Sequence, residues 1–211
     1  MARKKQARRH KSTGTSNKKA AGKPVSGKKR ATPKTKARAA KQPGTSAAPA
    51  GASATHALEM LRWTHALTHK LADGFAPEQA LYQGTPTENH LLWTFGHLAT
   101  AYSWFASLID GKTAAIPESY STLFYTNKPT GDASAYPALA EVREQCEKAY
   151  ARLTDAIAHL SPADALKPPA AEAYGFATNR LDAAYKAIWH EGWHQGQLST
   201  LRRALGMKGV F

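Results

Sequence analysis

The chain has 211 residues, of which 29 are Lys or Arg and 15 are Asp or Glu, so its formal net charge at pH 7 is +14. The charge is uneven, because residues 1–54 hold 16 of the basic residues and none of the acidic ones, whereas the other 157 residues carry a net charge of −2. A single cysteine excludes an intramolecular disulfide, and no run of about 18 apolar residues predicts a membrane span, so we expect a cytoplasmic protein with one near-neutral domain.

Residues 1–54 consist mainly of Lys, Arg, Ala, Gly, Ser, Thr and Pro, with no aromatic residue and with Val25 as the only branched aliphatic one. Such a segment cannot bury enough apolar surface to offset about 1–2 kcal/mol of backbone entropy per residue, so we predict a disordered tail before a folded domain of residues 55–211. Its basic clusters suit sequence-independent binding to nucleic acid or another polyanion. A solubilising tail is the alternative, and the composition fits both equally.

Helical periodicity begins after Ser53 and predicts a first helix from about Ala54 to Gly74. At 100° per residue, one arc of this helix collects its large apolar side chains and one threonine: Met60, Leu61, Thr64, Leu67, Leu71 and Phe75. His65 and His69 form an i, i+4 pair, but they lie about 100° to 140° from the centre of that arc. We therefore expect these two histidines to flank the buried face or to be solvated.

The segment Thr85-Pro86-Thr87-Glu88 predicts the start of a second helix, with Thr85 as the cap, Pro86 at the first helical position and Glu88 completing a capping box. This helix should run to about Asp110 and end at Gly111. Its apolar arc is wide, which predicts that it is largely buried. His90 lies one heptad before His97 and could support it, although capping a helix start is the more ordinary role.

The third helix is expected from near Tyr136 to about Leu160, after a connection in which Glu118–Phe124 forms a short helical turn. Its core seam repeats at three and four residues: Leu139, Val142, Cys146, Ala149, Leu153, Ile157 and Leu160. Cys146 lies inside this seam, so we interpret it as a small buried hydrophobe and not as a reactive thiol.

Thr178 or Asn179 can cap a fourth helix, which should reach Ala204 or Leu205 and end at Gly206. No segment shows the sustained alternation of period two that a half-buried strand requires. These patterns predict an all-α fold, a four-helix bundle with long connections.

Two histidines of the fourth helix, His190 and His194, share an arc with its apolar residues, whereas Glu191 lies on the opposite face, which we interpret as solvated. Residues at i and i+4 lie one turn apart, so both imidazoles can reach one metal ion, and His97 of the second helix can supply a third nitrogen. The alternative is that each is a core histidine hydrogen-bonded within the protein. The spacing alone favours this alternative.

The strings NHLLWTFGHLA at residues 89–99, HEGWHQGQ at residues 190–197 and LRRALG at residues 201–206 resemble the DinB-like (DinB/YfiT) superfamily. The resemblance covers about residues 55–208. It implies a metal-binding four-helix bundle whose ligands are His97, His190 and His194. Neutral imidazole is a good ligand for a divalent ion such as Zn²⁺, Ni²⁺ or Fe²⁺. Members of the superfamily include metal-dependent thiol S-transferases and related enzymes that use low-molecular-weight thiols, while many members have no assigned reaction.

Three neutral ligands leave the charge of a dication uncompensated, which favours the ionised form of a bound thiol or water. Gln197 lies one turn beyond His194 on the same face, so we expect it to orient a ligand or substrate or to serve as a structural hydrogen-bonding group. Three tryptophans could wall the pocket, although core packing is their ordinary role: Trp93, Trp104 and Trp193. Tyr174 and Glu191 are available as a general base, but the pattern fixes the position of neither.

Two glycines of the fourth helix, Gly192 and Gly196, project away from the histidine face. Glycine inside a helix costs roughly 1 kcal/mol relative to alanine, so we expect a compensating close approach of another helix or of a second subunit in a homodimer.

An alternative to the enzyme stays open. In it, the basic tail binds a polyanion and the bundle has no catalytic role.

Overall fold

The computed structural model describes residues 50–113, 116–126 and 128–211, and this part of the chain is all-helical, as predicted. Four long helices make up most of it: α1 (Ala50–Ala72), α2 (Leu91–Asp110), α4 (Leu139–Ala158) and α6 (Arg180–Ala204). Short helical segments lie in the connections: Pro77–Gln79, α3 (Ser119–Ser121), Thr122–Thr126, Ala133–Ala135 and α5 (Pro162–Ala165). The predicted tail lies almost wholly outside the described residues. Within the described part, every helix is too short or too polar to cross a membrane.

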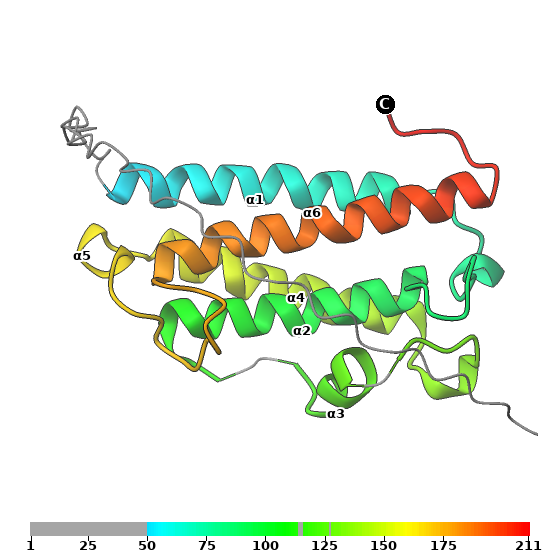
Figure 1. Ribbon diagram of the computed structural model, residues 1–211, viewed down its shortest axis with the longest axis horizontal. Helices are drawn as coiled ribbons and strands as arrows, with labels where there is room; N and C mark the ends of the chain where they lie inside the picture. The colour runs from blue at the N-terminus through cyan, green and yellow to red at the C-terminus, as the bar shows by residue number, and fades with distance from the viewer. Residues whose placement is uncertain (1–49, 114–115, 127) are drawn as a thin grey trace, which may run out of the picture. The chain divides into compact units, whose positions relative to one another are not determined.

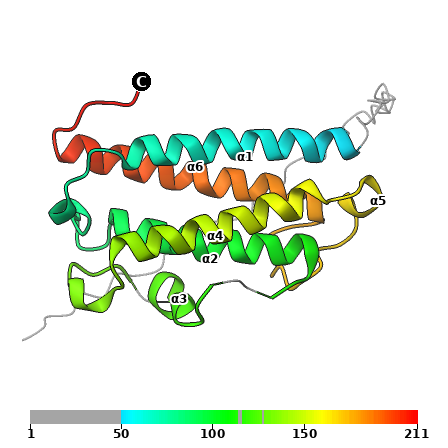
Figure 2. The ribbon, with the colours of Figure 1, turned by 180° about the vertical axis from the view of Figure 1, so that it is seen from behind.

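The long helices pack as two parallel pairs. The hydroxyl of Tyr185 donates to the backbone oxygen of Ser53, and the guanidinium of Arg202 donates to that of Leu71, so α1 and α6 run in the same direction. α2 and α4 run together in the opposite direction, and the chain between them returns along the packed helices and contains α3 (Figures 1 and 2). α2 is the most enclosed element, since 15 of its 20 residues are buried, as its apolar arc predicted.

The buried face of α1 differs from the predicted one. Met60 is 37% exposed, whereas His65 is only 6% exposed and Thr68 is fully buried. The prediction that His65 is a flanking or solvated residue is therefore wrong. Burial lowers the pKa of His65, but the Glu147 and Glu191 carboxylates outweigh burial and raise this pKa to about 9. The positive charge of the buried imidazole is therefore compensated by these two carboxylates. A polar side chain of α1 can be buried when it hydrogen-bonds to another helix, and the hydropathy pattern of α1 alone does not reveal such a partner.

The start of α2 is also different from the prediction. The helix begins at Leu91, and its cap is His90, whose Nδ1 accepts a hydrogen bond from the Trp93 backbone amide at 3.0 Å. Residues 85–88 instead form a turn in which the Glu88 carboxylate accepts from the backbone amide of Gly84 at 2.8 Å. The capping box failed because this acidic side chain closes onto the residue before Thr85 and not onto Thr85 itself.

Replacing His90 by asparagine is expected to change how stability depends on pH. His90 is fully buried, its Nε2–H donates to the Thr130 oxygen, and burial lowers its pKa to about 4. In the unfolded chain His90 binds a proton near pH 6.5, whereas in the folded chain it binds one only near pH 4. His90 therefore makes the wild type lose stability as the pH falls from about 6.5 to about 4.

Asparagine can still cap α2 but does not titrate, so the stability advantage of the wild type over His90→Asn should shrink by up to about 3 kcal/mol between pH 7 and pH 4. Urea unfolding of both chains at several pH values measures this difference. A difference that stays constant with pH would contradict the assignment.

The third and fourth long helices follow the sequence prediction. The residues of the predicted α4 seam are buried from Val142 to Leu160, and Leu139 at its start is half-buried. Cys146 is fully buried and burial raises the pKa of its thiol, which confirms the structural role. Asn179 caps α6, because its side-chain oxygen accepts from the Asp182 amide at 2.8 Å, and Gly206 follows the helix with a φ of +70°.

Candidate metal centre

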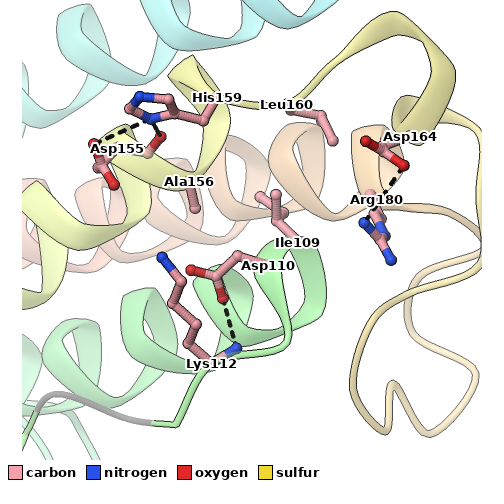
Figure 3. A pocket seen from close by; sticks show the side chains of 9 residues that line it. All are labelled: Ile109, Asp110, Lys112, Asp155, Ala156, His159, Leu160, Asp164 and Arg180. Carbon is pink, nitrogen blue, oxygen red and sulfur yellow. Dashed lines mark hydrogen bonds and ion pairs between the residues drawn. The ribbon is translucent and has the colours of Figure 1, made fainter.

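One polar cavity of about 360 Å³ lies where α2 and α4 end, beside α5 and the start of α6 (Figure 3). Its three aspartates are each in an ion pair: Asp110 with Arg152, Asp155 with His159, and Asp164 with Lys167. Each of these carboxylates already has a side-chain partner, so the three aspartates are not a free ligand set.

His97 is held on α2 by two neighbours. Its Nδ1 lies 2.7 Å from the backbone oxygen of Phe124, and its ring stacks on Trp93 at 4.7 Å between centroids with an interplanar angle of 9°. Since a carbonyl oxygen can only accept, Nδ1 carries the proton and Nε2 keeps its lone pair. Gly96 makes this contact possible, because a Cβ there would overlap the Phe124 ring.

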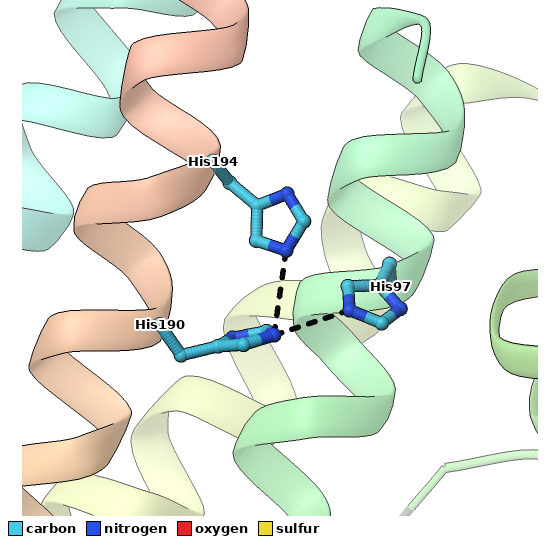
Figure 4. Close-up of side chains that lie close together, drawn as sticks. All are labelled: His97, His190 and His194. Carbon is cyan, nitrogen blue, oxygen red and sulfur yellow. Dashed lines mark hydrogen bonds between the residues drawn. The ribbon is translucent and has the colours of Figure 1, made fainter. Parts of the chain in front are cut away.

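His190 and His194 project from successive turns of α6 toward His97 (Figure 4). The Nδ1–H of His194 donates to the side-chain oxygen of Gln197 at 2.8 Å, and this same oxygen accepts from Asn89 at 3.1 Å. With Gln197 held by Asn89, the His194 lone pair is on Nε2. Gln197 therefore orients a histidine of the site, whereas Asn89 was not predicted to take part.

The three Nε2 atoms converge on one point (Figure 4). The Nε2 of His190 lies 3.2 Å from that of His97 and 3.4 Å from that of His194, and all three atoms lie within 4.8 Å of one another. Imidazole nitrogens bound to one ion at about 2.0–2.1 Å are separated by roughly 2.8–3.4 Å, from octahedral to tetrahedral geometry. These three residues can therefore hold a metal ion.

The electrostatics keep the three imidazoles neutral. Burial lowers the pKa of His97, and burial together with the neighbouring imidazoles lowers that of His190 to about 4 and that of His194 to about 3. A metal ion binds the neutral form of histidine, so no proton has to be displaced at pH 7. The buried Nδ1 of His190 has no hydrogen-bond partner among the described residues.

A cavity of about 460 Å³ opens beside the histidines. It is lined mainly by apolar and hydroxyl-bearing side chains: His97, Thr100, Ala101, Trp104, Phe105, Ser121, Tyr125, Ala173, Tyr174, Phe176 and His190. None of these lining residues is acidic, and none is Lys or Arg. The cavity therefore suits a small molecule with an apolar part, placed next to the Nε2 atoms of His97 and His190.

The other side chains that the sequence suggested for the pocket wall or for a base lie in different places: two at the cavity, one at the surface and one in the interior. Trp104, for which core packing was the default expectation and a place in the pocket wall the alternative, lines the cavity, and so does Tyr174, a candidate base. Trp193 is 58% exposed and contacts Trp189, so it neither lines the cavity nor packs in the core. Glu191 is fully buried, although we had placed it on a solvated face, and it faces His65 and Thr68.

The glycines of α6 have open surroundings. A Cβ at Gly192 or Gly196 would meet no described atom within 4 Å. The expectation that they permit close approach of another helix of this chain is therefore wrong for the described residues. Their contact with a second subunit stays a prediction.

Replacing Gln197 by leucine is expected to weaken metal binding by about 10- to 100-fold, since the acceptor that fixes the His194 ring is lost while the volume is kept. Competition for Zn²⁺ against a chromophoric chelator measures the affinity. Thr200→Ala, on an exposed position of the same helix, is the matched control and should bind as the wild type does. Equal affinities of Gln197→Leu and the wild type would rule out the orienting role.

The comparison with known families points to one of them. A family model described as the DinB superfamily matches residues 60–198. This match begins within α1 and ends on α6, so it contains His97, His190 and His194 as well as Gln197. No curated protein matches the chain.

Proposed function

The chain belongs to the DinB superfamily, and from this premise we propose that it is a divalent-metal-dependent enzyme, a thiol S-transferase that acts on a low-molecular-weight thiol. The observation that carries the proposal is the convergence of three neutral Nε2 atoms at the wall of an apolar cavity. The same premise supports reading α1, α2, α4 and α6 as a four-helix bundle of the DinB type.

We assign the metal to His97, His190 and His194, and Zn²⁺, Ni²⁺ and Fe²⁺ all suit a set of imidazole ligands. A divalent ion held there supplies Lewis acidity, which favours the ionised form of a thiol at neutral pH. His97 and His194 are already fixed in the tautomer that leaves Nε2 without a proton, by the Phe124 carbonyl and by Gln197. The ligands are therefore preorganised by the fold.

The cavity residues would bind the second substrate, the electrophile that reacts with the thiol. Trp104, Phe105 and Phe176 form mutual ring contacts on one wall, and they exclude water from the apolar part of an electrophile. Tyr174 is 84% exposed at the cavity and offers a hydroxyl near its opening. Because none of the described residues that line the cavity carries a carboxylate, we assign the thiol proton to solvent and not to a general base of the wall.

The test is a thiol-transfer assay with the full-length protein loaded with Zn²⁺ or Ni²⁺. Monobromobimane is the electrophile: a carbon–sulfur bond forms, bromide leaves, and the thiol proton goes to buffer. We expect the metal-loaded wild type to accelerate the reaction of at least one thiol in a panel of cysteine, glutathione and cysteinyl-sugar thiols. His194→Ala should be inactive, and the exposed His159→Ala should be fully active.

The outcome that would overturn the proposal is a wild type that, with either metal, reacts no faster than the thiols alone. Acceleration that survives complete removal of the metal by a chelator would equally exclude the mechanism, because the histidine ligands would then have no part in it.

A second candidate function rests on charge. Residues 1–54 hold 16 basic and no acidic residues, so we propose that they attach the protein to nucleic acid or another polyanion. Deletion of residues 1–49, which stops before α1 begins, should remove salt-sensitive DNA binding and leave the metal content unchanged. A full-length protein that ignores DNA at low salt would end this proposal.

A further inference from the structure

A second cluster of potential ligands lies between α1 and α4, built from His65, His69 and Glu147. The two histidine Nε2 atoms are 3.1 Å apart, and the Glu147 carboxylate oxygens lie 3.2 Å from the Nε2 of His65 and 2.9 Å from that of His69. We propose that this cluster is a second binding site for a divalent first-row transition metal, separate from the three-histidine site.

The spacing of the ligand atoms supports the proposal. Nitrogen and oxygen ligands about 2.0–2.2 Å from one ion are separated by roughly 2.8–3.6 Å, from octahedral to tetrahedral geometry. The two histidine Nε2 atoms have this spacing, and each has it to one of the two Glu147 oxygens, while one ligand atom from each residue lies within 4.8 Å of the others. A set of two imidazoles and one carboxylate on one side of an ion is a recognised ligand combination for Fe²⁺ and Zn²⁺, and it leaves positions open.

The ring of His65 is held in place by residues on the side opposite His69 and Glu147. Its Nδ1 lies 3.4 Å from a carboxylate oxygen of Glu191 and 3.3 Å from the hydroxyl of Tyr102, and Tyr150 stacks on its ring at 3.6 Å between centroids. A buried carboxylate that accepts from the far nitrogen of an imidazole is the arrangement that fixes metal-binding histidines. It engages Nδ1 and leaves Nε2 facing His69 and Glu147, where a bound ion would take the place of the proton that pairs His65 with Glu147 in the metal-free chain.

The two carboxylates at the cluster, those of Glu191 and Glu147, favour the binding of a cation. Glu191 is fully buried, one of its oxygens accepts from Thr68 at 2.6 Å, and the other has no hydrogen-bond partner among the described residues. With Glu147, two carboxylates face two histidines. A dication bound by the two histidines and Glu147 would lie beside both carboxylates, and the fully buried charge of Glu191 is costly unless it is offset.

The cluster is open to an ion from one side only. The side chains of His69 and Glu147 are 37% and 46% exposed, whereas that of His65 is 8% exposed and closes the inner side. An ion therefore reaches the site from solvent without a rearrangement of the helices. The three-histidine site lies between α2 and α6, so the two sites share no ligand.

The experiment counts the metal ions bound to the full-length protein. The chain is stripped with a chelator, dialysed to equilibrium against Zn²⁺, and analysed for zinc per chain. We expect two equivalents for the wild type, one for His69→Ala, one for His194→Ala and none for the double variant. His159→Ala, which removes an exposed histidine that is paired only with Asp155 of its own helix, should keep two.

His69 is chosen over His65 because its side chain is partly exposed, and Glu147→Gln provides a second variant that removes charge but keeps shape. Glu147→Gln should bind the second zinc at least tenfold more weakly, with an unchanged circular-dichroism spectrum. If His69→Ala and Glu147→Gln bind zinc as the wild type does, the second site does not exist. If zinc is lost in these variants but not in His194→Ala, the proposed function fails and the second site stands.

Discussion

Replacing His194 by alanine should weaken zinc binding at the three-histidine site at least 100-fold and abolish thiol transfer. The Nε2 of His194 is one of the three nitrogens that converge on the centre among the described residues, and its ring is fixed by Gln197. A ligand that binds only the folded chain stabilises it, by about 2.7 kcal/mol when its concentration is 100 times the dissociation constant. Zinc should therefore raise the melting temperature of the parent chain and not that of the variant.

Both chains are best compared with His69 already replaced, so that zinc reports on the three-histidine site alone. Melting curves with and without Zn²⁺ then measure the linkage directly, and elemental analysis measures the stoichiometry. Thr200→Ala in the same background should keep the full thermal shift. A His194→Ala chain that is stabilised by zinc as much as its parent would exclude His194 as a ligand.

Replacing Gly96 by alanine is expected to destabilise the fold and disturb the metal centre together. A Cβ at this position would overlap the ring of Phe124, which is itself fully buried. Insertion of a methyl group into a packed core typically costs about 1–3 kcal/mol. The backbone oxygen of Phe124 also accepts from His97, so a shift of Phe124 moves the group that orients this ligand. Stability and zinc affinity should both fall.

Gly192→Ala is the matched control, because a Cβ there meets no described atom within 4 Å. Alanine should stabilise α6 by about 1 kcal/mol through helix propensity. Urea unfolding measures both free energies, and chelator competition measures zinc affinity. Unchanged stability of Gly96→Ala would contradict the steric argument. A Gly192→Ala chain that loses a dimer would show that this glycine contacts a second subunit.

The helices whose core seam is apolar could be predicted from the sequence. α4 repeats aliphatic and small residues at helical spacing, and α6 combines an Asn179 cap with a clear apolar arc, so their limits were predicted closely. The candidate ligands His190 and His194 were found because they share that arc. His97 needed the resemblance of its surrounding motif, since one histidine on a largely buried helix carries no signal of its own.

The polar contacts between helices could not be predicted in this way. His65 and Glu191 are buried against each other, yet each looks like a solvated residue in the periodicity of its own helix. A compensated buried charge has the same sequence signature as an exposed one, because compensation depends on a partner more than a hundred positions away. The capping of α2 failed for a related reason, as Glu88 had a competing acceptor role at Gly84.

The acceptor for His97 is a main-chain carbonyl and not a side chain. Every amino acid at position 124 would offer the same oxygen, so a point substitution there alters ring volume without deleting the hydrogen bond. What controls the tautomer of His97 is the number of residues in the crossover from α2 to Phe124. Insertions and deletions in that crossover should therefore harm the site more than most single replacements, which is the reverse of the usual tolerance of connecting loops.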